Sequence, residues 1–242
     1  MVISDIEILR FADAIYAGNS KVQWDHYDTG TDWSTDGVCW GIKTFKGFDI
    51  VAFRGSANVL DWIRDSQVWT SPFNHKGLGP VHPGFFNGME KTWAEIKPLL
   101  KNPLILTGHS LGAARADILS GLAILDGVKP ARVVIMGEPR PGFTQLRNLI
   151  WGCPRASYRT VDKLGKIDLV TTVPIAFPPE EYIHPTPMID LLVVPDYLDH
   201  WGAFRLHHSE LYLAGLESGP QVTPRVMWSD IFRLIVEKLM VT

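Results

Sequence analysis

Cysteine is scarce in this sequence. Only Cys39 and Cys153 occur among its 242 residues, and they form no metal-ligand spacing. Because 46 % of the residues are hydrophobic, a chain of this length can bury a large core without covalent cross-links. We therefore expect two buried thiols rather than a disulfide, and no metal site.

Three further features are missing. No basic run interleaved with aromatic residues occurs and the net charge is −3, so nucleic acid is not an expected partner. No uninterrupted apolar stretch reaches the roughly 18 residues that a membrane-spanning helix needs. The N-terminal MVISDIEILR lacks the basic start and apolar core of a signal peptide. This predicts a soluble, cytoplasmic protein and leaves release or secretion open.

Strand-like and helical patterns alternate through the middle of the chain. Short apolar runs typical of buried strands lie at 103–107, 131–136 and 157–161. Apolar residues at helical spacing cover 86–100, 111–125 and 143–150. This alternation predicts an α/β fold with a mostly parallel central sheet and helices on both faces. No repeat or shift in composition marks a boundary, so we expect a single domain over residues 1–242.

The first part of the chain carries a helix signal and a hairpin signal. A capping-box spacing begins at Ser4, and apolar residues then recur at helical spacing until Gly18. Two strand-like runs at 37–45 and 48–53 are separated by the dipeptide KG, which suits a hairpin turn. Towards the other end, a further strand is expected near Leu191.

The strongest chemical signal is the pentapeptide GHSLG at 108–112, which matches G-x-S-x-G. It directly follows an apolar strand-like run and precedes a helix rich in Ala and Leu, which is the setting of a nucleophile elbow. The pattern places Ser110 at the carboxyl edge of the sheet as a candidate nucleophile. It also places the Leu111 N–H at a helix N-terminus, where it can face a developing oxyanion. The alternative is a glycine-flanked turn in which Ser110 only caps the helix.

A serine nucleophile needs an imidazole to accept its proton and a carboxylate to orient that imidazole. In this architecture the three residues follow in the order serine, acid, histidine. The candidate acids that this order leaves are Asp162, Asp168, Glu180, Glu181 and Asp190. The candidate histidines are His184, His200, His207 and His208. The order alone does not choose among them.

Five motifs follow one another along the chain. They are VAFRGS at 51–56, DWIRD at 61–65, VHPGF at 81–85, GHSLG at 108–112 and GEPRPG at 137–142. Each is weak to moderate alone, but together and in this order they resemble the class 3 (fungal-type) lipases. The resemblance spans most of the chain and implies an α/β-hydrolase fold.

The resemblance also implies an oxyanion hole and a lid. Ser56 matches the family's second oxyanion donor, which acts beside Leu111 through its backbone N–H and its hydroxyl. Asp65 matches the aspartate that holds that hydroxyl. The amphipathic segment 58–65, with Trp62 among its apolar residues, matches the lid helix. The alternative is an ordinary surface helix with Trp62 packed in the core.

For the rest of the triad, the resemblance points to two positions. Asp168, in KIDLV, matches the acid, and Asp162 is the alternative. His207, placed before Tyr212 in a terminal segment, matches the histidine, and the adjacent His208 is the alternative.

The expected function is hydrolysis of lipid or other apolar esters by a triacylglycerol lipase or carboxylesterase. It uses a Ser–Asp–His triad and an acyl-enzyme, with no cofactor. The expected partners are a small-molecule ester or lipid and, transiently, a lipid surface. The alternatives are a non-catalytic binding module of the same fold, or a peptidase or thioesterase on that fold.

Overall fold

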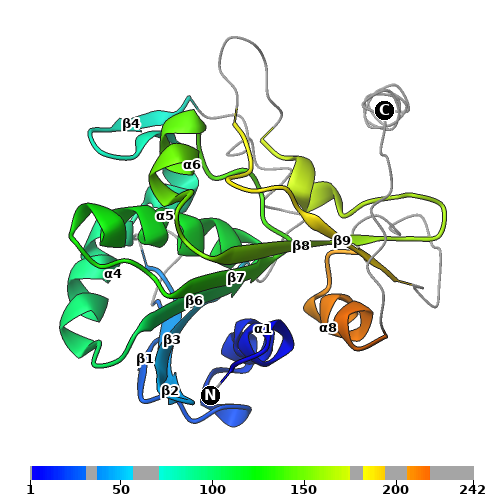
Figure 1. Cartoon of the computed structure of the whole chain (residues 1–242), viewed down its shortest axis with the longest axis horizontal. Coiled ribbons are helices and arrows are strands. Elements are labelled where there is room, and N and C mark those ends of the chain that lie inside the picture. The colour runs from blue at the N-terminus through cyan, green and yellow to red at the C-terminus, as the bar shows by residue number, and fades with distance from the viewer. Residues whose placement is uncertain (1, 31–36, 57–70, 175–181, 194–205, 219–242) are drawn as a thin grey trace.

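A seven-stranded sheet forms the centre of the computed structural model, which describes residues 2–30, 37–56, 71–174, 182–193 and 206–218 (Figure 1). The strand order is β1-β2-β3-β6-β7-β8-β9. The strands are β1 (His26–Asp28), β2 (Trp40–Phe45), β3 (Phe48–Phe53), β6 (Leu104–His109), β7 (Arg132–Met136), β8 (Arg155–Val161) and β9 (Ile189–Leu192). The first three strands pair antiparallel, and every pair from β3 to β9 is parallel. The mostly parallel sheet expected from the sequence is therefore confirmed.

Helices cover both faces of this sheet, as the alternating pattern predicts (Figure 1). One face carries α3 (Pro83–Phe86), α4 (Met89–Ile96), α5 (Leu111–Leu125) and α6 (Thr144–Ile150). The other face carries α1 (Asp5–Ala14) and α8 (Ser209–Ser218). A separate two-stranded sheet, formed by β4 (Phe73–His75) and β5 (Gly79–Val81), lies beside α6.

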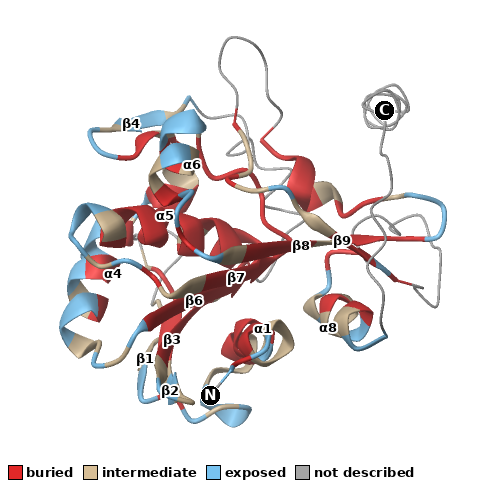
Figure 2. Ribbon diagram, in the orientation of Figure 1, coloured by how far each residue is buried: buried red, intermediate tan, exposed pale blue. Residues whose placement is uncertain are grey.

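The alternation of side chains along each strand explains why both faces need a cover. In β6, Leu104 and Leu106 belong to the core on the α5 side, whereas Ile105 belongs to the core on the α1 side. The central strands are accordingly buried along their length (Figure 2). A run with no polar positions is what a strand covered on both faces requires.

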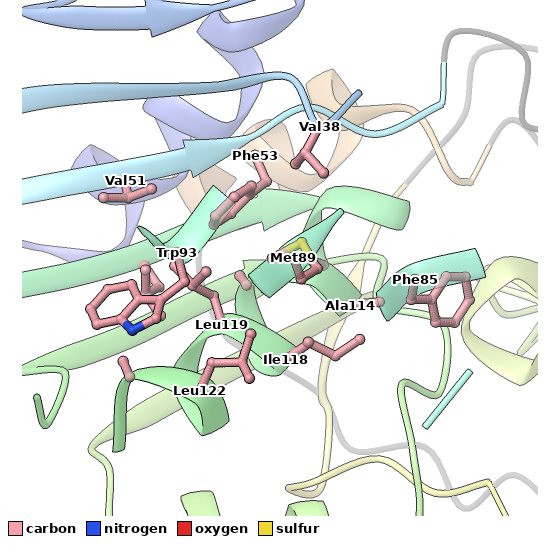
Figure 3. Close-up of a cluster of buried hydrophobic side chains, with 14 of the residues drawn as sticks. Val38, Val51, Phe53, Phe85, Met89, Trp93, Ala114, Ile118, Leu119 and Leu122 are labelled. Carbon is pink, nitrogen blue, oxygen red and sulfur yellow. The ribbon is translucent and has the colours of Figure 1, made fainter. Parts of the chain in front are cut away.

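Helix α5 lies in the thickest part of the molecule. Almost all of its residues are buried, because it packs on the sheet and is itself covered by α3, α4 and α6. Figure 3 shows Ile118 and Leu122 of α5 in the same cluster as Trp93 of α4 and Phe53 of β3. A helix rich in Ala, Leu and Ile fits such a position.

The hairpin turn and the first helix are confirmed. Lys46 and Gly47 join β2 to β3 with φ of 49° and 81°, the positive values that a tight two-residue turn requires. Ser4 caps α1 in a complete capping box with Glu7. The helix changes to a 3-10 turn, η1 (Ile15–Ser20), before the expected end at Gly18.

One predicted element is wrong. The expected helix over 86–100 is broken, because α3 ends at Phe86 and α4 starts only at Met89. Gly88 lies between them with φ of 77°, a left-handed conformation that interrupts a right-handed helix. At the far end, the chain tightens into the 3-10 turn η3 (Lys97–Leu99).

The two thiols are buried and free, as expected. The proposed lid segment at 58–65, with Trp62 and Asp65, lies outside the described residues. The candidate residues Glu180, Glu181 and His200 lie outside them as well.

Candidate active site

Ser110 occupies a sharp corner between β6 and α5. Its φ of 59° and ψ of −131° are costly for a residue with a side chain, and they are characteristic of a strained strand-to-helix turn. The Ser110 side chain makes no capping bond to α5. The alternative interpretation, a serine that only caps the helix, is therefore wrong.

The two glycines of the motif are required by close contacts. A Cβ at Gly108 would lie 2.3 Å from the backbone oxygen of Gly112. A Cβ at Gly112 would lie 2.2 Å from the backbone oxygen of Phe53, at the end of β3. The corner can close, and α5 can start against β3, only because both positions lack a side chain.

The loop after β3 lies directly against this corner. A Cβ at Gly55 would lie 3.0 Å from the Cβ of Ser110. Ser56, the next residue, is 4 % exposed, and its buried hydroxyl has no hydrogen-bond partner in the part of the chain that the structure describes. Leu111 is the first residue of α5, where a backbone N–H has no partner within the helix. The chain thus places two candidate oxyanion donors near the candidate nucleophile.

His207 and Asp168 meet in the core behind the corner. His207 Nδ1 lies 2.6 Å from Asp168 Oδ2, and Asp168 is fully buried. The same carboxylate accepts bonds from the Val170 N–H at 2.9 Å and the Tyr212 hydroxyl at 2.5 Å. Three donors stabilise a negative charge at this position without water.

The second ring nitrogen of His207, Nε2, has no hydrogen-bond partner among the described residues. Since Nδ1 donates to a carboxylate, Nε2 of a neutral ring is an acceptor. This atom is buried, and no described residue hydrogen-bonds to it. An imidazole that is oriented on one side and unpaired on the other can accept a proton from a serine hydroxyl.

The end of β7 makes room for the imidazole. A Cβ at Gly137, whose φ is 63°, would lie 2.9 Å from His207 Cε1 and 3.1 Å from the Tyr212 hydroxyl. The His207 ring also packs on the ring of His109, the residue before Ser110, with centroids 4.5 Å apart. The histidine therefore lies against the residue that directly precedes Ser110.

The alternative acids have other partners. Asp162 accepts the backbone N–H groups of Leu164 and Lys166, both at 2.8 Å, and so closes the turn after β8. Asp190 pairs with Arg159 at 2.8 Å. Neither carboxylate hydrogen-bonds to an imidazole among the described residues, and the geometry favours Asp168.

Neither of the two alternative histidines that the structure describes has the surroundings of His207. His208 is exposed. His184 lies 2.7 Å from the backbone oxygen of Thr171 through Nε2 and 3.4 Å from Glu138 through Nδ1. The geometry favours His207 among the described candidates.

Two contacts of this site were not recognised in the sequence. Tyr212 served there only as a spacing marker, yet its hydroxyl binds the carboxylate of Asp168. Burial raises the pKa of Tyr212 well above its usual value, so the hydroxyl stays a donor. His109 also binds the backbone of His207. Its place inside the motif was the only available signal.

Two kinds of feature are absent from the described ranges. No cluster of three or more His, Cys, Asp or Glu side chains there could hold a metal ion. No helix there has the length and hydropathy of a membrane span.

The mostly parallel sheet, the helices on both faces and the strained serine corner define an α/β hydrolase. Comparison with known families narrows this class. Residues 50–177, just over half of the chain, match the family Lipase (class 3). The chain belongs to this family.

Curated relatives match over part of their length. The secreted mono- and diacylglycerol lipase 1 of Fusarium solani is 31 % identical over 118 residues, which cover 46 % of this chain and 35 % of the relative. Lipase ZK262.3 of Caenorhabditis elegans is 31 % identical over 102 residues, which cover 38 % and 29 %. The chain thus spans about a third of the length of the curated relatives it matches.

Solved structures share the fold at low identity. The structure of a mutant MDLA from Penicillium cyclopium aligns with a TM-score of 0.60 and 19 % identity, over 80 % of this chain and 78 % of the other. A triacylglycerol lipase from Penicillium expansum aligns with a TM-score of 0.58 and 17 % identity, over 77 % of each chain.

Proposed function

We propose that this chain is a serine hydrolase of lipid or other apolar carboxylic esters. Ser110 is the nucleophile, His207 the general base and Asp168 the acid that orients it. The proposal rests chiefly on one observation: His207 is bound at Nδ1 by a buried carboxylate 2.6 Å away, keeps an unpaired, buried Nε2, and packs on His109, the residue before Ser110. Membership of the class 3 lipases and the lipase names of both curated relatives support it.

Acylation is the first half of the proposed reaction. His207 Nε2 takes the hydroxyl proton of Ser110 as the serine oxygen attacks the ester carbonyl. The backbone N–H groups of Ser56 and Leu111 hold the resulting oxyanion, and each lowers the barrier by about 3 kcal/mol. The imidazolium then protonates the leaving alcohol, and an acyl-serine remains.

Deacylation repeats these steps with water. His207 removes a proton from the water molecule, whose oxygen attacks the acyl carbon on Ser110. The same donors hold the second oxyanion, and the imidazolium returns its proton to the serine oxygen as the carboxylic acid leaves. Asp168 keeps the ring in one tautomer and stabilises its positive charge in both halves.

Segment 58–65 is the proposed lid. Ser110 and Leu111 are only 1 % and 3 % exposed, so an ester reaches them only after part of the protein moves. An amphipathic helix beside the site can move in this way at a lipid surface. Activity per enzyme should then rise as the substrate passes its solubility limit. Hyperbolic kinetics through that limit would indicate an esterase without a lid.

A phosphonate probe and one substitution test the proposed chemistry. A fluorophosphonate should add to Ser110, as peptide mass spectrometry can show, and Ser110→Ala should lose both the adduct and the hydrolysis of a nitrophenyl ester. The substitution should leave the melting temperature close to that of the parent. Full hydrolysis by a folded Ser110→Ala protein would refute the assignment.

The other candidate activities separate in a substrate panel. Esters, thioesters and amides of one acyl chain distinguish an esterase from a thioesterase or peptidase, and a non-catalytic module turns over none of them and takes no phosphonate. The cytoplasmic location stays a prediction.

A further inference from the structure

Two hydrogen bonds join three distant segments behind the candidate site. The Tyr16 hydroxyl lies 2.9 Å from His109 Nδ1, and His109 Nε2 lies 2.7 Å from the backbone oxygen of His207. A Cβ at Gly55 would lie 2.3 Å from the Tyr16 hydroxyl oxygen, so the oxyanion loop packs directly on this hydroxyl. The oxyanion loop, the nucleophile corner and the triad histidine are thus connected through a tyrosine from η1.

One placement of the protons satisfies the hydrogen bonds of Tyr16 and His109. A carbonyl oxygen only accepts, so His109 Nε2 carries the proton that it donates to the backbone of His207. Nδ1 of the neutral ring is then an acceptor and takes the Tyr16 hydroxyl proton. The Tyr16 oxygen also lies against the backbone of Gly55, which therefore stays next to His109.

This arrangement persists while His207 changes its charge. Burial lowers the pKa of His109 well below its usual value, and a positive charge on His207 lowers it further. Burial also raises the pKa of Tyr16. His109 therefore stays neutral and Tyr16 protonated, so neither competes for the proton that His207 transfers.

The bond from His109 anchors one of three successive carbonyl groups. The Leu206 oxygen accepts from the Thr160 hydroxyl on β8, and the His208 oxygen accepts from the Leu211 N–H at 3.0 Å. Only the middle anchor, on His207 itself, comes from the residue next to Ser110. This bond is therefore a direct link between the backbone of His207 and the residue next to Ser110.

We propose that His109, held in its tautomer by Tyr16, is a positioning residue that fixes His207 and the oxyanion loop relative to Ser110. The expected effect on kcat rests on the proposed hydrolysis. The expected effect on the geometry of His207 does not depend on that activity. Small misplacements of reacting groups cost about 100-fold in rate.

The test removes one hydroxyl and keeps the ring. In Tyr16→Phe, His109 Nδ1 loses its donor and Gly55 loses its contact with the hydroxyl oxygen. We expect kcat to fall about 10- to 100-fold with little change in KM, measured per site titrated with a fluorophosphonate. The matched control is Tyr158→Phe, which loses a hydrogen bond of 2.6 Å from its hydroxyl to Asp5. Neither residue hydrogen-bonds to Tyr16 or His109. It should lose melting temperature but not kcat.

A second pair of variants tests the middle link directly. His109→Gln keeps an N–H that can reach the His207 carbonyl, whereas His109→Leu has no donor. The glutamine variant should retain about ten times more kcat than the leucine variant, which corresponds to one hydrogen bond. Equal kcat in two folded variants would contradict the positioning role.

A proton resonance reports the geometry without any turnover. The His207 Nδ1 proton, shared with Asp168 across 2.6 Å, should appear far downfield in the proton spectrum. It should shift or broaden in Tyr16→Phe and stay unchanged in Tyr158→Phe. Unchanged kcat and resonance in Tyr16→Phe, or equal kcat losses in both variants, would overturn the inference. If the parent hydrolyses no ester but the resonance moves only in Tyr16→Phe, the proposed function fails and the positioning role holds.

Discussion

Asp168 and Asp117 are both fully buried, yet the chain meets their charge differently. Asp168 accepts hydrogen bonds from a backbone N–H, an imidazole and a phenol, so both of its oxygens are satisfied. Asp117, on α5, pairs with Arg155 through one oxygen, and its other oxygen has no hydrogen-bond partner within the described residues. The first site is built for an anion and the second is only partly so.

The second site, around Asp117 and Arg155, contains another buried acid, Glu138. Burial raises the pKa of Asp117 well above its usual value and raises that of Glu138 as well. Among the described residues, Glu138 has long polar contacts with Ser157 at 3.3 Å and His184 at 3.4 Å. Burial alone therefore does not decide how well a carboxylate is stabilised. The donors that reach it do.

The largest expected effect is on kcat and comes from a substitution at the first site, Asp168. In Asp168→Asn, an amide replaces the acceptor of the His207 proton and favours the wrong tautomer, so kcat on a nitrophenyl ester should fall about 10⁴-fold. The side chain keeps its size, and the melting temperature should change little. A folded variant with kcat within tenfold of the parent would show that Asp168 is not the triad acid.

Breaking the second site should affect stability and spare activity. Arg155→Met removes the buried guanidinium, whose side chain is 3 % exposed, and leaves Asp117 without its cation. Unfolding in urea should show a loss of about 3 to 5 kcal/mol. The kcat per titrated site should stay within threefold of the parent.

The double variant Arg155→Met with Asp117→Leu is the control for that experiment. It replaces both partners by apolar side chains, and most of the lost stability should return. A double variant as unstable as Arg155→Met alone would place the cost in packing rather than charge.

A smaller effect concerns pH. Burial lowers the pKa of His184 from 6.5 to about 4, whereas the unfolded chain takes up this proton near pH 6.5. The neutral histidine therefore contributes stability that is present above pH 6.5 and is lost as the pH falls towards 4. The contribution is about 3 kcal/mol at most.

His184→Gln tests this contribution by unfolding at pH 7 and pH 4. The variant should lose less stability than the parent on acidification. The raised pKa values of Asp117 and Glu138 act in the opposite sense, because their contribution is lost as the pH rises, and their effect largely cancels between the two proteins. Identical pH dependence of the two proteins would show that His184 is not held neutral.

The smallest expected effect sharpens the first site. Tyr212→Phe removes one of the three donors to Asp168 and should lower stability by about 2 kcal/mol. The remaining two donors still orient the carboxylate, so kcat should fall only about tenfold. Tyr158→Phe, which also loses a hydroxyl–carboxylate bond, should match the stability loss without the loss of kcat. Equal kcat in the two variants would remove Tyr212 from the site.

The fold could be predicted where local pattern and burial agree. The expected helix over 111–125 coincides with α5, because the segment is rich in Ala, Leu and Ile, which suit a helix that packs on several sides. The strands beside it carry apolar residues on both faces, which only a covered parallel sheet satisfies. The prediction failed at Gly88, where one left-handed residue interrupts an otherwise helical pattern. It also missed β1, whose three residues are held by pairing with β2 rather than by their own pattern.

The sequence by itself determined the candidate nucleophile, because the elbow is a local structure whose glycines and flanking elements are contiguous. It could only narrow the acid and the histidine to sets, since order along the chain restricts them but distance in space selects them. Asp168 and His207 stand 39 residues apart and meet because β8, the turn after it and the start of α8 converge behind the corner. The link through Tyr16 and His109 joins residues 93 positions apart. Such contacts exist only once the sheet has brought its carboxyl ends together, and no local pattern carries them.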